Sequence, residues 1–155
     1  MESMIITEEN IELLARKVIE IIEEKNKNEA FVILLEGDLG AGKTTFVKSF
    51  GKCLSIEEDI LSPTFILKKG YDAVHHKIKK IIHVDAYRFN EKEEAKMLRL
   101  EEDAKIKGNI ILIEWPSKMY YIKPDLTLSF EVIDENTREV KVQPEADQPL
   151  AESRI

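Results

Sequence analysis

The sequence predicts an α/β fold: one domain built on a mixed sheet that includes antiparallel strands and is flanked by helices. A short run of branched apolar residues, Phe31–Leu35, is typical of a strand buried on both faces. A glycine-rich turn follows it and leads into a helix expected to start at about Lys43. The 155 residues are 43% hydrophobic, which suits one domain with a core of its own.

The N-terminal third is expected to hold two helices, one on each side of that strand. Thr7 can cap a helix, and apolar residues after it recur at spacings of three and four until about Asn26. The second helix is expected from about Lys43 to Leu54. The apolar residues that define the two helices are Ile11, Leu14, Val18, Ile21 and Ile22 in the first and Phe46, Val47 and Phe50 in the second.

The rest of the chain is expected to alternate between strands and polar connections. Residues 70–79 should form a turn or hairpin tip, and residues 90–107 a surface helix or two short ones. The domain is expected to span residues 1–142, and residues 143–155 to form a polar C-terminal tail. The expected strands are Thr64–Lys69, Lys80–Val84, Asn109–Glu114, Leu126–Val132, which alternates and should be half-exposed, and Glu139–Val142.

Charge and composition narrow the range of functions. The formal net charge is −7, which argues against a protein that coats nucleic acid by bulk charge. Cys53 is the only cysteine, so an intrachain disulfide is excluded and a cysteine-based metal site is not expected. Neither a basic leader nor an apolar run of about 20 residues is present, so we expect a cytoplasmic protein without a membrane segment.

Residues Gly37–Thr44 carry the strongest functional signal, because they match the phosphate-binding pattern G-x-x-x-x-G-K-[ST]. The backbone N–H groups of such a loop form an anion nest, and the following helix adds its positive end. Lys43 is expected to reach the terminal phosphates and the Thr44 hydroxyl to bind Mg²⁺. The residues expected to bind the nucleotide here are Asp38, Leu39, Gly40, Ala41, Gly42, Lys43, Thr44 and Thr45.

Two of the expected strands end in a carboxylate, at Asp85 and at Glu114. A phosphate-binding loop needs a second acid to hold Mg²⁺ or to orient the attacking water. Ligands of open α/β sheets lie at the carboxyl ends of the strands, where both acids are expected. The residues alone support a Mg²⁺-dependent nucleotide hydrolase or kinase. They leave open which acid holds the metal and which orients water.

Four segments in order give the chain a resemblance to one family. They are Leu35–Thr45, Ser62-Pro63-Thr64-Phe65, His83-Val84-Asp85-Ala86-Tyr87-Arg88 and Ile113-Glu114-Trp115-Pro116. With these segments the chain resembles the bacterial ATPase of tRNA threonylcarbamoyladenosine biosynthesis, the TsaE (YjeE-like) family, from about residue 5 to residue 142. The resemblance implies a P-loop NTPase-like domain with ATP and Mg²⁺ as cofactors and weak hydrolysis alone. It also implies the partner proteins TsaB and TsaD, with tRNA contacted indirectly.

The resemblance also implies roles for particular residues. Asp85 matches the acid needed for hydrolysis, and Glu114 matches an acid near the Mg²⁺ that Thr44 binds. Both acids, with Lys43, are the expected catalytic residues, and Thr64 matches a switch-like threonine near the phosphates. The chain departs from the family in lacking a glycine in Leu54-Ser55-Ile56 and a glycine and tyrosine in Met97–Ala104. The alternatives are a non-catalytic nucleotide-dependent switch and a small-molecule kinase, although the scattered arginines disfavour the kinase.

A basic cluster in residues 68–80 is the main remaining feature. It could approach tRNA or an acidic partner, but a solvated hairpin tip is the favoured interpretation. His75-His76 is not expected to bind a metal, because the spacing places no third ligand. His83 is expected to be a packed or exposed strand residue and not a catalytic base, and Cys53 is expected to be a buried, inert thiol. The basic cluster consists of Lys68, Lys69, His75, His76, Lys77, Lys79 and Lys80.

Overall fold

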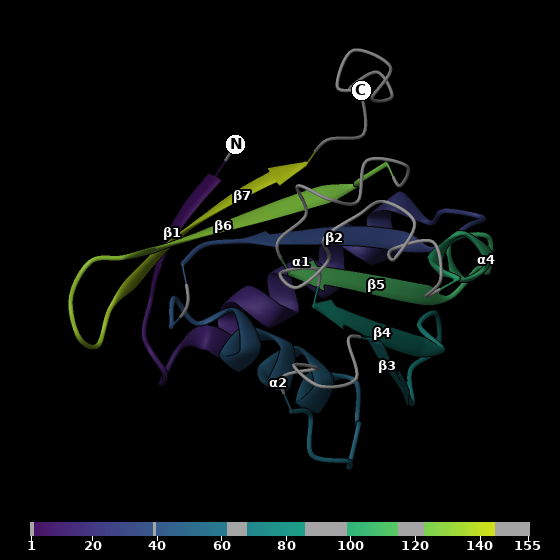
Figure 1. The fold of residues 1–155 in the computed structure, drawn as a ribbon, viewed down its shortest axis with the longest axis horizontal. Helices are drawn as coiled ribbons and strands as arrows, with labels where there is room; N and C mark the ends of the chain where they lie inside the picture. The colour runs from purple at the N-terminus through teal and green to yellow at the C-terminus, as the bar shows by residue number, and fades with distance from the viewer. Residues whose placement is uncertain (1, 39, 62–67, 86–98, 115–122, 145–155) are drawn as a thin grey trace.

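The computed structural model describes residues 2–38, 40–61, 68–85, 99–114 and 123–144. In these ranges seven strands form one sheet in the order β1-β7-β6-β2-β5-β4-β3 (Figure 1). The helices are α1 (Ile11–Lys25), α2 (Lys43–Cys53) and the short α4 (Leu100–Ala104). The strands are β1 (Glu2–Ile6), β2 (Phe31–Glu36), β3 (Lys68–Asp72), β4 (Lys80–Asp85), β5 (Asn109–Glu114), β6 (Leu126–Val132) and β7 (Arg138–Pro144).

The sheet is mixed, and this confirms the expected α/β fold class. In its centre, β2 pairs in parallel with both β5 and β6, and β4 pairs in parallel with β5. The outer pairs β1/β7, β6/β7 and β3/β4 are antiparallel. The carboxyl ends of β2, β4 and β5 therefore meet at one edge of the sheet, and the loop after β2 leads there into α2.

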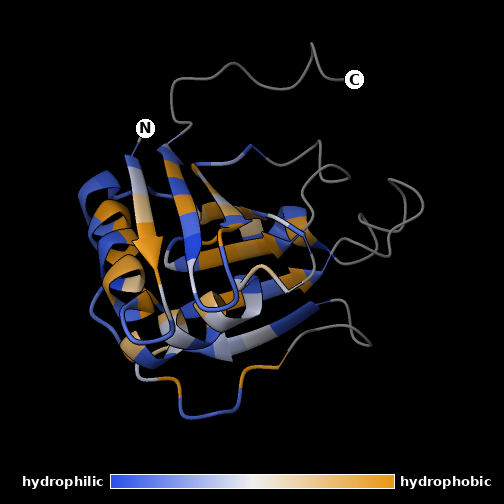
Figure 2. Cartoon of the chain, turned by 90° about the vertical axis from the view of Figure 1, so that its left-hand side faces the viewer, coloured by the Kyte–Doolittle hydropathy of each residue, from blue (hydrophilic) through white to orange (hydrophobic). Residues whose placement is uncertain are grey.

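Both faces of the central strands are buried. Helices α1 and α2 share one core with alternate strand residues such as Ile33, Ile81 and Leu112. A smaller core on the opposite face joins Leu100 of α4 to the intervening strand residues such as Val32. Figure 2 shows the middle strands mostly in orange, as expected for parallel strands covered on both sides. Because both faces of these strands are buried, their sequences are continuous apolar runs.

The N-terminal region differs from the expected elements in two ways. Strand β1 was not predicted, because Glu2–Ile6 has no periodicity of its own and is fixed by antiparallel pairing with β7. Helix α1 begins at Ile11 and not directly after Thr7. The Thr7 N–H instead donates to Asn10 Oδ1 at 2.6 Å, so these two residues form a turn that precedes the helix.

Later segments differ from expectation at their boundaries. Residues 70–72, expected in a turn, continue β3, because they pair with Lys80–Ile82 of β4. Leu126, Thr127 and Leu128 at the start of β6 are all buried, so this part of the strand is not half-exposed as expected, and β6 pairs with β2 on one side and β7 on the other. Strand β7 reaches Pro144, which pairs with Leu126, two residues beyond the expected strand end. The expected elements in 64–67 and 90–98, and the remainder of the expected tail in 145–155, lie outside the described residues.

Candidate functional site

The expected phosphate-binding loop connects β2 to α2 at the carboxyl edge of the sheet. Gly37, Gly40 and Gly42 all have positive φ angles, of 147°, 80° and 103°. The Ala41 N–H donates to the Asp38 carbonyl oxygen at 3.0 Å, and the Arg138 guanidinium of β7 donates to the Gly40 carbonyl oxygen at 3.3 Å. The loop is thus held both by its own backbone and by the neighbouring hairpin, with α2 beginning directly behind it.

Lys43 is the first residue of α2, and its side chain turns back over the loop. Its Nζ donates to the Gly37 carbonyl oxygen at 2.5 Å, and the residue is only 5% exposed. Burial lowers the pKa of Lys43, and the carboxylates of Glu114, Asp85 and Asp38 act in the opposite direction. Because burial removes the Lys43 ammonium group from water, an anionic ligand that binds in the loop stabilises its charge.

The structure brings Asp85 and Glu114 together at the ends of β4 and β5. They are directly opposite in the parallel register of the two strands, and they are only 7% and 5% exposed. Alternation along each strand turns both side chains toward the face covered by α2. There the Thr44 hydroxyl donates to Glu114 Oε1 at 3.3 Å. Two carboxylates and a hydroxyl are hard oxygen donors, so the expected ligands Thr44 and Glu114 fit Mg²⁺.

Sequence reasoning missed one contact of this carboxylate pair. His83 is fully buried, which settles the choice between a packed and an exposed strand residue, and its Nε2 lies 3.1 Å from Glu114 Oε1. His83 and Asp85 are two residues apart on β4 and therefore share a face, which is the signal that could have placed them together. Since an ionised carboxylate only accepts, Nε2 carries the proton of this bond.

A cavity of about 530 Å³ lies on the other side of the loop, over β6 and β7. Gly37, Asp38 and Ala41 line it from the loop, and Phe130 lines it from β6. Because β2 separates β6 and β7 from β4 and β5 in the sheet, the loop has the cavity on one side and the carboxylates on the other.

Most of the sequence-predicted site residues can be placed. Asp38, Gly40, Ala41 and Gly42 lie in the loop, and Thr45 is exposed on the first turn of α2. Lys43, Thr44, Asp85 and Glu114 converge as described above. Leu39 and Thr64 lie outside the described residues.

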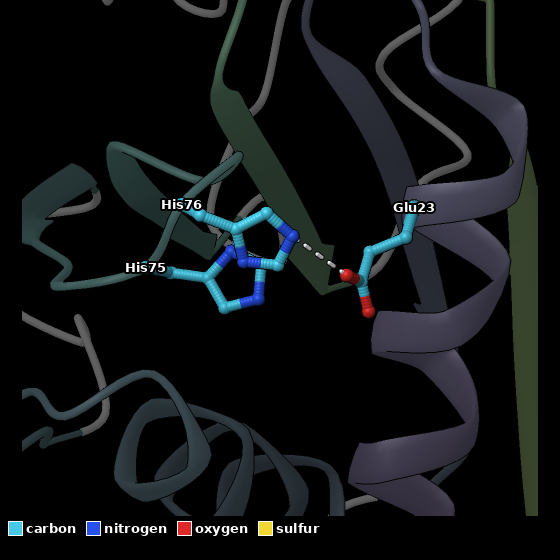
Figure 3. A group of neighbouring side chains, drawn as sticks. All are labelled: Glu23, His75 and His76. Atoms are coloured by element: carbon cyan, nitrogen blue, oxygen red, sulfur yellow. Dashed lines mark ion pairs between the residues drawn. The ribbon is translucent and has the colours of Figure 1, made fainter.

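A second cluster of polar side chains changes the premise of the expectation for His75 and His76, which was that no third ligand lies near them. Glu23 of α1 supplies the third potential ligand that sequence spacing could not place, and Figure 3 shows both imidazoles facing its carboxylate. However, His75 Nδ1 accepts the backbone N–H groups of Lys77 and Ile78 at 3.1 and 3.2 Å. The neutral ring then carries its proton on Nε2, which leaves no lone pair for a metal. We therefore assign no metal to this cluster.

The same contacts favour a structural role for the basic cluster of residues 68–80. His76 Nε2 pairs with Glu23 Oε2 at 3.1 Å, and Lys77 Nζ donates to the Glu23 carbonyl oxygen. Lys68 pairs with Asp103 of α4. These contacts attach the β3–β4 hairpin to α1 and α4. Cys53 is half-buried, less than expected, and burial raises the pKa of its thiol.

No helix in the described ranges is long and apolar enough to cross a lipid bilayer.

A buried strand, a glycine-rich loop with a returning lysine, and acids at the ends of two adjacent parallel strands define a P-loop NTPase-like α/β protein. A family model described as "Threonylcarbamoyl adenosine biosynthesis protein TsaE" matches residues 5–142. The chain belongs to this TsaE family.

Individual relatives agree with this assignment. The chain is 44% identical over 118 residues to the tRNA threonylcarbamoyladenosine biosynthesis protein TsaE of Nostoc sp., covering 73% of this chain and 70% of that protein. It is 33% identical over 144 residues to the TsaE protein of Aquifex aeolicus, covering 91% and 94%. The crystal structure of Bacillus subtilis YdiB superposes with a TM-score of 0.64 at 26% identity, covering 92% and 86%.

Proposed function

We propose that the protein is a Mg²⁺-dependent ATPase that acts with TsaB and TsaD in the threonylcarbamoyladenosine modification of tRNA. The observation that carries the proposal is the convergence of Lys43 and Thr44, at the start of α2, with the buried pair Asp85 and Glu114. Membership of the TsaE family supports the role in tRNA modification, and the geometry of the site supports ATP hydrolysis.

The loop and the start of α2 bind the phosphates of ATP. Backbone N–H groups at a helix N-terminus attract anions, and Lys43 adds a cation whose burial gives it few competing water contacts. The cavity over β6 and β7 has room for the nucleoside, because ligand sites commonly measure about 300–1,000 Å³. The phosphates then lie between the cavity and the two carboxylates.

Thr44 and Glu114 hold Mg²⁺, directly or through water, and Asp85 orients the attacking water. Mg²⁺ bound by these residues would neutralise the charge that develops on the transferred phosphoryl group. Asp85 and Glu114 are opposite each other in the strand register, so one can face the metal while the other faces the water. Thr64 is proposed to sense the γ-phosphate and to couple its loss to the partner-binding surface.

The test separates nucleotide binding from turnover in the purified protein. Lys43→Ala should abolish tight binding of a fluorescent ATP analogue, whereas Lys48→Ala, on the exposed face of the same helix, should not. Asp85→Ala should retain binding and lose hydrolysis. If Asp85→Ala hydrolyses ATP like wild type, Asp85 does not have this role. Tight binding without any turnover in wild type favours the nucleotide-dependent switch.

A further inference from the structure

We infer that His83 is a positioning residue, which orients the Glu114 carboxylate and thereby sets how tightly the site holds Mg²⁺ beside the nucleotide. This inference rests on the proposed function, because it assigns the control of metal affinity within the same site.

The hydrogen bonds around Glu114 are asymmetric. His83 Nε2 donates to Oε1 at 3.1 Å, and the Thr44 hydroxyl donates to the same oxygen at 3.3 Å. Within the described part of the chain, both bonds to this carboxylate end on Oε1. Two donors from different elements, β4 and α2, fix the plane of the carboxylate and leave Oε2 as the oxygen available to a cation.

The chemistry of His83 does not suit a purely packing role. Its neighbours on the same face, Ile81 two residues earlier and Leu112 opposite on β5, are apolar and fully buried. His83 Nδ1 is buried, and no group in the described ranges bonds to it. A buried ring nitrogen without a partner costs stability, and an apolar side chain of similar volume avoids that cost. The gain that offsets this cost is the bond from Nε2 to Glu114.

The expected size of the effect follows from other metal sites. Partners that orient a metal ligand through a hydrogen bond commonly change metal affinity by about 10–100-fold when they are removed. Losing the His83 bond lets the Glu114 carboxylate rotate, although Thr44 still contacts it. We therefore expect a change near the lower end of that range.

The experiment measures the Mg²⁺ dependence of nucleotide binding, which does not require turnover. A fluorescent ADP analogue is titrated into wild type, His83→Phe and His83→Gln, first in EDTA and then at increasing Mg²⁺ concentrations. Leu112→Val is the matched control, because it disturbs packing directly opposite His83 without touching the bond to Glu114. Thermal unfolding is recorded for each variant.

His83→Phe should raise the half-saturating Mg²⁺ concentration about tenfold while leaving the affinity in EDTA unchanged. His83→Gln can still donate an N–H group and should recover part of this loss, and Leu112→Val should match wild type. If His83→Phe does not fold, His83→Asn replaces it, since the shorter amide does not reach Oε1.

Two results would overturn the inference, and they are distinguishable. If the half-saturating Mg²⁺ concentration of His83→Phe stays within twofold of wild type, His83 has only a packing role. If wild type binds no nucleotide, the proposed function itself fails and the inference fails with it.

Discussion

Gly37 is the residue of the phosphate-binding loop where an added methyl group should do the most damage. Its φ angle of 147° is a conformation that L residues rarely adopt, and a Cβ atom there would lie 2.8 Å from the Phe130 carbonyl oxygen. Phe130 belongs to β6, which is paired with β7 on one side and packs against the α2 core on one face. The strand cannot yield, so the loop must move.

Gly40→Ala in the same loop provides the matched comparison. Gly40 also has a positive φ angle, of 80°, but among the described residues beyond its chain neighbours no heavy atom lies within 4 Å of its added Cβ. Gly40→Ala therefore carries backbone strain alone, about 1 kcal/mol. Gly37→Ala carries strain and a steric clash, together about 2–3 kcal/mol. At about 3 °C per kcal/mol for a chain of this size, we expect Tm to fall by about 3 °C in Gly40→Ala and about 6–9 °C in Gly37→Ala.

Thermal unfolding followed by circular dichroism measures both variants under the same conditions. Nucleotide titration adds a second readout, because a displaced loop should also weaken binding at least tenfold in Gly37→Ala. Equal Tm values for the two variants would show that the contact with β6 is not what constrains the loop.

Three further predictions concern parts of the fold outside the loop. Asp125 Oδ2 accepts the buried Val32 N–H at 2.8 Å, so Asp125→Ala should reduce the free energy of unfolding by about 2–3 kcal/mol and Asp125→Asn by less, as measured by denaturant titration. Burial lowers the pKa of His75, so the unfolded chain takes up this proton first, and stability should fall as pH drops below about 6.5. Unfolding measured between pH 8 and 5 should show a shallower fall in His75→Asn, and an unchanged slope would contradict this. Because burial raises the pKa of the Cys53 thiol, a thiol reagent at pH 8 should react more slowly with the folded protein than with the unfolded one, and equal rates would contradict this.

The features that the sequence could predict are those formed by residues contiguous in the chain. The loop and the strands β2, β4 and β5 are specified by contiguous residues, and the position of Asp85 and Glu114 at the ends of two expected strands was enough to place both at one edge of the sheet. Strand β1 has little pattern of its own, and its pairing partner β7 begins more than 130 residues later.

The contacts that were not predicted also join residues that lie far apart in the sequence. Glu23 of α1 reaches His76 in the β3–β4 connection, and His83 meets Glu114 only because β4 and β5 pair in a particular register. Such contacts follow from tertiary pairing and have no signature in either segment alone.

The proposed function requires that this site hydrolyses ATP and that TsaB and TsaD control the rate. The most direct measurement is the steady-state rate of ATP hydrolysis by the purified protein, alone and with TsaB and TsaD, compared with Lys43→Ala. We expect a low basal rate that TsaB and TsaD raise and that Lys43→Ala abolishes. Hydrolysis that persists in Lys43→Ala, or a rate that the partners leave unchanged, would contradict the proposed function.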